Sequence, residues 1–162
     1  MPQTEVKTSR YVLFLLLSLI GAGLSYFSVY EHLVFSLVGE AGTSLCNINQ
    51  QVNCAGAIRS KYSSLFGFPI GVFGGAFYLS AFVLGLFALR GESEYRAKFA
   101  SVFTLLALLS LGVSCLLLYV SLAEIGSICP VCFGLYLISL FFYITVIFLE
   151  RGESSLARGG RE

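Results

Sequence analysis

The stretch from Cys129 to Leu149 reads CPVCFGLYLISLFFYITVIFL and contains no charged side chain. An α-helix rises about 1.5 Å per residue, so about 20 residues cross the roughly 30 Å hydrocarbon core of a bilayer. The stretch is long enough and apolar enough for one crossing, and it begins with two cysteines separated by two residues. It therefore predicts a membrane helix with a Cys-x-x-Cys motif at its start.

Three earlier segments have the same apolar character, from about residue 11 to 30, 66 to 89 and 99 to 123. Only 12% of the residues are charged, against about 25% in typical soluble chains. The first segment is too long for a signal peptide and no small-residue cleavage site follows it. We expect one domain over residues 1–162: an all-α integral membrane protein, folded as a four-transmembrane-helix bundle whose outer loop, residues 31–65, lies on the membrane surface.

The basic residues predict the orientation of this bundle. Eight of the ten fall on one side of a four-span arrangement, and only Arg59 and Lys61 fall on the other. The eight are Lys7, Arg10, Arg90, Arg96, Lys98, Arg151, Arg158 and Arg161. Because loops rich in lysine and arginine stay in the cytoplasm, both termini are expected there. The 31–65 loop and the turn at 124–128 then face outward.

Several functional classes are disfavoured. The net charge is +1, and the sequence has no basic patch interleaved with aromatics and no glycine-rich phosphate loop, so we expect no nucleic-acid partner. The single histidine, His32, excludes a metal site with several imidazole ligands. The predicted spans carry no ionisable side chain at mid-membrane, which disfavours a transporter.

The motif Cys129-Pro130-Val131-Cys132 has a chemical logic at a helix start. Proline is tolerated at the first helical position, so Pro130 places Cys129 at the N-cap and Cys132 one turn further on the same face. Unpaired backbone N–H groups and the positive end of the helix dipole stabilise a thiolate there. Such a pair can cycle between dithiol and disulfide. A static disulfide or half of a zinc site would use the same spacing.

A second pair, Cys46 and Cys54, lies in the outer loop. By itself it could be a structural staple, and four cysteines together could bind zinc. Two mobile pairs on one membrane face could instead relay electrons by thiol–disulfide exchange, and the outward side is where disulfides persist. We favour the relay. The fifth cysteine, Cys115, lies among leucines and is interpreted as a small apolar residue.

The combined pattern resembles the vitamin K epoxide reductase family. The resemblance rests on the spacing of the loop cysteines, on Ser64-Leu65-Phe66-Gly67 opening the second helix, and on the Cys-x-x-Cys opening the fourth. It covers essentially the whole chain. It implies that Cys132 is nearest a quinone, that Cys129 exchanges with Cys54, and that Cys46 meets the external thiol donor.

The resemblance also implies a quinone pocket between the helices. Ser60, Phe66 and Tyr136 would line it, with Ser63 where the animal members have an asparagine. That departure and the shorter outer loop favour quinone reduction over epoxide reduction, which stays as the alternative. No fused thioredoxin-like domain follows, so a separate thioredoxin-like (DsbA-like) protein is expected as the partner on the outer side.

The predicted function is therefore membrane thiol–disulfide oxidoreduction that supports disulfide formation. The acceptor would be menaquinone, ubiquinone or vitamin K, with no metal, in a bacterial inner membrane or, as the alternative, the endoplasmic reticulum membrane. A bacterial disulfide-generating protein of the B type would carry its two cysteine pairs in the reverse order. A claudin-like structural protein would carry a tryptophan signature, and this chain has no tryptophan.

Overall fold

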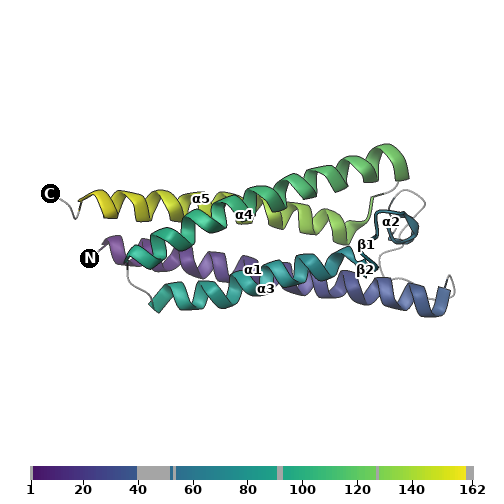
Figure 1. Cartoon of the computed structure of the whole chain (residues 1–162), viewed down its shortest axis with the longest axis horizontal. Coiled ribbons are helices and arrows are strands. Elements are labelled where there is room, and N and C mark those ends of the chain that lie inside the picture. Colours follow the sequence, from purple (N-terminus) through teal and green to yellow (C-terminus); the bar gives the residue numbers. More distant parts are fainter. Residues whose placement is uncertain (1, 40–51, 53, 91–92, 127, 160–162) are drawn as a thin grey trace.

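The computed structural model describes residues 2–39, 52, 54–90, 93–126 and 128–159 (Figure 1). The fold consists of four long helices, with a short helix and two short strands between the first and the second of them. In chain order they are α1 (Pro2–Val38), α2 (Ala55–Arg59), β1 (Ser64–Leu65), β2 (Phe68–Pro69), α3 (Ile70–Arg90), α4 (Ser93–Val120), a π-helical turn (Ser121–Ile125) and α5 (Pro130–Gly159).

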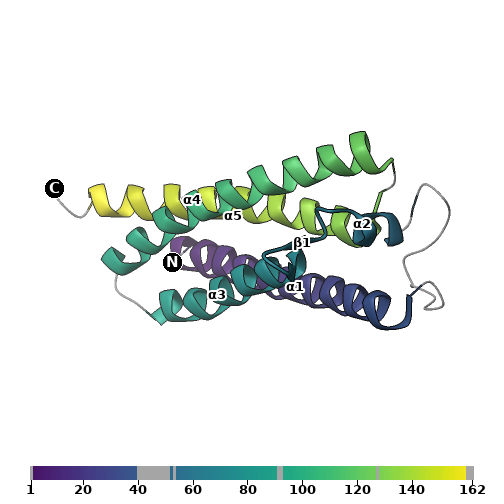
Figure 2. The same ribbon diagram turned by 45° about the vertical axis from the view of Figure 1, so that its right-hand side comes forward.

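The four long helices lie side by side as an elongated bundle. Both chain ends lie at one end of it, at the left in Figure 1, and α2, β1 and β2 lie at the other end. Helix α1 packs against α3 and α5, and α4 packs against α5. Helices α3 and α4 are joined by a short connection, yet they touch each other little. The turned view in Figure 2 shows α3 beside α1 and α4 beside α5.

All four long helices are suited to a membrane. The segments Ser9–Val38, Ile70–Arg90, Lys98–Ile125 and Pro130–Gly152 each contain an 18-residue window with a mean hydropathy of 2.0 to 2.4. Their outer faces expose large apolar side chains, as lipid-facing surfaces do; Leu105 is 69% exposed and Phe87 is 62% exposed. The predicted four-span helical bundle is confirmed.

Two boundaries differ from the sequence-based expectation. Helix α1 continues to Val38 instead of ending near residue 30, because no helix breaker follows residue 30 until Gly39, whose φ is +66°. The second span begins at Ile70 instead of residue 66. The residues before it form the β1–β2 hairpin, in which Phe66 and Gly67 have φ values of 53° and 82°. Two successive positive φ values are typical of a tight hairpin turn.

The half of the bundle nearest the chain ends is tightly packed. The ring of Phe14 lies 5.9 Å from Phe99, 5.9 Å from Phe103 and 4.9 Å from Phe142, centroid to centroid. Gly85 lets α3 approach this cluster, since a Cβ there would lie 2.7 Å from the Phe14 ring. The cavities described below lie beyond this cluster, toward the opposite end of the bundle.

Candidate redox site

Cys54 and Cys129 meet at the end of the bundle away from the chain termini. A parallel bridge between Val52 and Ile128 aligns the two chain segments just before these cysteines. Cys54 is the N-cap of α2, and Cys129 directly precedes the first residue of α5. Their Sγ atoms lie 3.0 Å apart, and both side chains are buried. Residues 75 positions apart in the chain thus place two sulfur atoms in direct contact.

The three described cysteines at this end are in different redox states. Cys54 is disulfide-bonded, whereas Cys129 and Cys132 are free thiols. Cys46, the other predicted member of the loop pair, lies outside the described residues. A disulfide bond is about 2.05 Å long, so the 3.0 Å contact between Cys54 and Cys129 is non-bonded but close. A thiolate on Cys129 would stand directly against a disulfide sulfur, the arrangement that exchange requires.

The surroundings of Cys129 favour its thiolate. The thiol of Cys132 donates a hydrogen bond to the Cys129 sulfur, and this contact is the main cause that lowers the pKa of Cys129 to about 7. The backbone N–H of Cys132 also points at Cys129 Sγ, at 3.4 Å. Backbone N–H groups of the first helical turn have no partner within the helix, so an N-cap side chain can accept from them. The second cysteine of the motif therefore stabilises the thiolate of the first.

Two effects oppose this activation. Burial of Cys129 raises its pKa, because the charged form loses water. The carboxylate of Glu31, a buried residue in the C-terminal part of α1, also raises it by repelling the thiolate. The lowered pKa of Cys129 is the net result, and it shows that the contacts from Cys132 and the helix start outweigh both.

We predict that Cys132→Ala raises the pKa of Cys129 from about 7 toward the ordinary thiol value. The alanine removes the donor that stabilises the thiolate, whereas Cys132→Ser keeps a hydroxyl donor at the same place. The measurement is the pH dependence of Cys129 alkylation, in a chain whose Cys46, Cys54 and Cys115 are alanine. The pH at which the alkylation rate is half-maximal should rise by at least one unit for Cys132→Ala and by less for Cys132→Ser. Identical profiles for the two variants would contradict the assignment.

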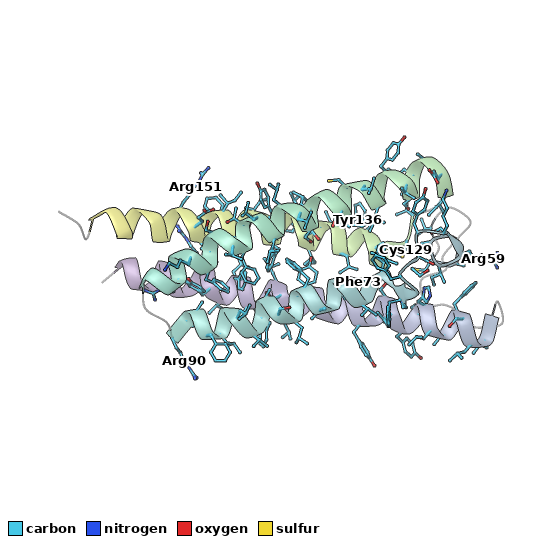
Figure 3. All side chains as sticks on the ribbon, viewed as in Figure 1. Arg59, Phe73, Arg90, Cys129, Tyr136 and Arg151 are labelled. Carbon is cyan, nitrogen blue, oxygen red and sulfur yellow. The ribbon has the colours of Figure 1, made fainter. Side chains whose placement is uncertain are left out.

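A cavity of about 710 Å³, part of which is open to the surroundings, lies beside these sulfur atoms near the end of the bundle and is called the outer cavity here. Cys54, Cys129 and Cys132 line it, together with three residues predicted to bind quinone: Ser60, Ser63 and Tyr136. Figure 3 shows Tyr136 on the same helix as Cys129 and farther from the α2 end of the bundle. The structure thus gathers three of the four predicted quinone-site residues around the cysteines.

An inner cavity of about 1010 Å³ adjoins the outer one and lies farther toward the middle of the bundle. Cys132 and Tyr136 line both cavities. All four long helices line the inner cavity, with most of the wall supplied by α3 and α4, the two helices that touch each other little. This wall is mostly apolar and includes Phe73, Phe77, Leu106, Leu109 and Val113. Cys132 therefore stands where the cavity lined by the cysteines and several polar side chains meets a more strongly apolar one.

The segment that carries Cys54 is held down by contacts to two long helices. The Arg59 guanidinium lies 5.6 Å from the centroid of the Phe35 ring, on the part of α1 that extends beyond the predicted span. The Tyr62 hydroxyl donates a hydrogen bond of 3.3 Å to Glu124, in the π-helical turn after α4. These contacts hold α2 over the outer cavity, so that Cys54 faces Cys129.

The structure does not place Phe66 with the other predicted quinone-site residues. Its side chain is 88% exposed and lines neither cavity, because the β1–β2 turn directs it away from the bundle. Phe73, seven residues later on α3, lines the inner cavity instead (Figure 3). Glu31 and His32, which follow the predicted end of the first span, also line the outer cavity. Their burial depends on the helical extension of α1, which the sequence pattern did not reveal.

Among the described side chains, no three of His, Cys, Asp or Glu gather as ligands of a metal ion would. A comparison with protein-family models finds one match, described as the vitamin K epoxide reductase family, over residues 12–147. No curated protein matches the chain. The family match spans all four cysteines of the two predicted pairs and most of every long helix.

Proposed function

Because the chain belongs to the vitamin K epoxide reductase family, a family of membrane oxidoreductases that use quinone-type substrates, we propose that it carries electrons from a thioredoxin-like protein to a membrane quinone. The electrons would pass through Cys46 and Cys54 to Cys129 and Cys132. The oxidation of thioredoxin-like partners would support disulfide formation outside the cytoplasm.

The observation that carries this proposal is the 3.0 Å contact between Cys54 and Cys129. Two structural staples would have no reason to place an activated thiol against a disulfide sulfur. The family match also argues against a claudin-like structural protein. An exchange-competent contact between the two pairs is what an electron relay needs.

The first half-reaction moves electrons between the pairs. With the loop cysteines reduced and Cys129–Cys132 oxidised, the Cys54 thiolate attacks Cys129, a Cys54–Cys129 bond forms, and Cys132 leaves as a thiolate. Cys46 then attacks Cys54 and releases Cys129. The loop is left as a disulfide and Cys129 and Cys132 as thiols, and the structure has this distribution at Cys54, Cys129 and Cys132.

The second half-reaction returns Cys129 and Cys132 to a disulfide. The quinone takes two electrons from the two sulfur atoms and two protons from the two thiols, so the reaction balances without another reductant. Cys132 is placed for this step because it lines both cavities. The apolar inner cavity suits a lipid-soluble ring and tail, and Ser60 and Tyr136 offer polar groups near the reacting sulfur.

We further propose that both chain ends are cytoplasmic and that the redox end faces the periplasm of a bacterial inner membrane. The two termini lie at one end of the bundle, and α2, whose N-cap Cys54 contacts Cys129, lies at the other (Figure 1). The excess of lysine and arginine on the terminal side supports this orientation.

The test is quinone reduction by the purified full chain in detergent. Supplied with a reduced thioredoxin-like protein and menaquinone or ubiquinone, the protein should form one quinol for each partner disulfide. Without the thiol donor, turnover should stop after two quinols per chain at most, one for each cysteine pair. Oxidation of the partner with no quinol formed would overturn the proposed acceptor, and quinol formation only from small thiols would overturn the proposed donor.

A further inference from the structure

One acidic side chain is buried beside the cysteines and has no part in the proposed electron relay. Of the acidic and basic side chains that the structure describes, only that of Glu31 is buried, at 6% exposed. Burial of a carboxylate costs free energy, so such a group in a cavity is a candidate for a functional role. Glu31 lines the outer cavity, and so does Ser28, which precedes it by three residues on the same face of α1. The Glu31 side chain therefore lies against the space that the cysteines share.

The Glu31 carboxylate and a cysteine thiolate repel each other at this site. Glu31 raises the pKa of Cys129, although the two residues are far apart in the chain. Repulsion between two negative charges is strongest where burial excludes water, and both side chains are buried. A carboxylate that takes the proton of a thiol removes one of the two charges. Proton transfer to Glu31 therefore lets a thiolate form without a second negative charge beside it.

The proposed exchange between the cysteine pairs has to move one proton. The Cys54 thiol must lose its proton before its sulfur attacks Cys129, because the thiolate is the nucleophile. When the Cys129–Cys132 bond breaks, Cys132 leaves as a thiolate, whereas in the reduced pair it is a thiol that donates to Cys129. One proton is thus lost at Cys54 and one is gained at Cys132. Both residues line the outer cavity together with Glu31.

Building on the proposed function, we propose that Glu31 carries this proton from the attacking Cys54 to the leaving Cys132. The carboxylate accepts the proton of the Cys54 thiol as the Cys54–Cys129 bond forms. The electron pair of the broken Cys129–Cys132 bond leaves with Cys132, which takes the proton from the Glu31 carboxylic acid. Glu31 ends as the carboxylate with which it began, so the step balances. Part of the cavity is open, and water that enters it bridges the distances between these groups.

Other titratable groups face the same cavity from the elements around it. They are His32 of α1, Cys54 at the start of α2, Tyr62 after α2, Cys129 before α5, and Cys132 and Tyr136 of α5. Arg59 of α2 and Glu124 of the π-helical turn are exposed and do not line it. His32 is only half-buried. Apart from the cysteines themselves, Glu31 is the one titratable group of this set whose charge shifts the pKa of Cys129.

The test follows the exchange alone, in the full chain and without quinone. The fully oxidised protein receives one equivalent of a reduced thioredoxin-like protein. Acid quenching, alkylation and peptide mapping then give the rate at which the two thiols move from the loop pair to Cys129 and Cys132. We expect Glu31→Gln to slow this transfer about 100-fold at about pH 6.5, a usual contribution of general acid–base catalysis. The difference should shrink toward about pH 9, where hydroxide removes the Cys54 proton without help.

Two results would overturn the proposal. If Glu31 acted only by repelling thiolates, Glu31→Gln would lower the pKa of Cys129 and leave the exchange as fast as in wild type or faster. If the substitution only damaged the site, the exchange would be slow to the same degree at every pH. Acetate separates these cases from proton transfer. It should raise the rate of Glu31→Gln, because a small carboxylate in the open part of the cavity replaces the missing base, and should leave wild type unchanged.

The matched control is Glu150→Gln. Glu150 is a carboxylate in the C-terminal part of α5, where it accepts a hydrogen bond of 2.7 Å from Thr104, and it lines neither the outer nor the inner cavity. This variant makes the same chemical change away from the cysteines. Its exchange rate should stay within twofold of wild type at every pH, and acetate should not alter it.

The exchange experiment needs no quinone, so the two proposals can fail separately. If the thiols never reach Cys129 and Cys132 in wild type, the proposed relay fails together with this inference. If wild type transfers them and Glu31→Gln does so at the same rate, only the role of Glu31 fails.

Discussion

Replacing Cys132 with alanine is expected to reduce quinone reduction by about 1000-fold or more, whichever thiol donor is used, as for the loss of an essential nucleophile. Cys132 is the cysteine that lines both the sulfur-lined outer cavity and the apolar inner cavity. Without it, Cys129 has no partner with which to form a disulfide after giving up electrons. No donor can bypass this defect, because every donor must finally use the Cys129–Cys132 pair.

The matched control is Cys115→Ala. Cys115 is a free, exposed cysteine on α4 and lines neither cavity, so its replacement should leave the rate within twofold of wild type. The measurement is the initial rate of quinol formation, first with a reduced thioredoxin-like protein and then with a small dithiol. A Cys132→Ala protein that keeps more than a tenth of the wild-type rate with either donor would show that quinone is reduced elsewhere.

The four membrane spans were predictable because lipid imposes a simple requirement. A span must be about 20 apolar residues long and must satisfy its own backbone, and both conditions are visible in a single sequence. The end of α1 was less predictable. Hydropathy marks where lipid ends, but a helix continues until something stops it, and here the stop is at Gly39, well past residue 30.

The positions of Phe66 and Phe73 show a different limit of prediction from sequence. The sequence places Phe66 and Phe73 in similar apolar surroundings, seven residues apart. Only the backbone separates them: a turn with positive φ at Phe66 directs its ring outward, whereas Phe73 follows the regular helix into the inner cavity. A phenylalanine is unusual at positive φ, so sequence patterns gave no warning of this turn.

The Cys54–Cys129 contact lies beyond what spacing could predict. Four cysteines on one membrane face allow several pairings, and the residues alone left open a staple, a zinc site or a relay. The resemblance to a known family assigned Cys54 to Cys129, and the structure places those two sulfur atoms 3.0 Å apart. The backbone bridge between Val52 and Ile128 that aligns them has no signature in either local sequence.

Replacing Cys46 with alanine is expected to trap a covalent Cys54–Cys129 bond. In the proposed relay, Cys54 attacks Cys129 first and Cys46 then releases it, so a chain without Cys46 should stop at the mixed disulfide. Peptide mapping under non-reducing conditions should find Cys54 joined to Cys129 in most of the protein, against a few per cent in wild type. Quinone reduction driven by a thioredoxin-like protein should fall about 100-fold or more, whereas a small thiol, which can reduce the trapped bond directly, should restore much of the rate.

Cys54→Ala tests whether Cys54 is the sulfur that attacks Cys129. It removes the attacking sulfur, so no trapped species should form, and activity should again depend on the small thiol. A bond between Cys54 and Cys132 in the Cys46→Ala chain would contradict this mechanism. It would mean that Cys132 exchanges with the loop, although Cys129 is the cysteine whose thiolate is stabilised. The 3.0 Å contact and the lowered pKa of Cys129 both favour Cys129 as the exchanging sulfur, since it leaves and attacks most readily as a thiolate.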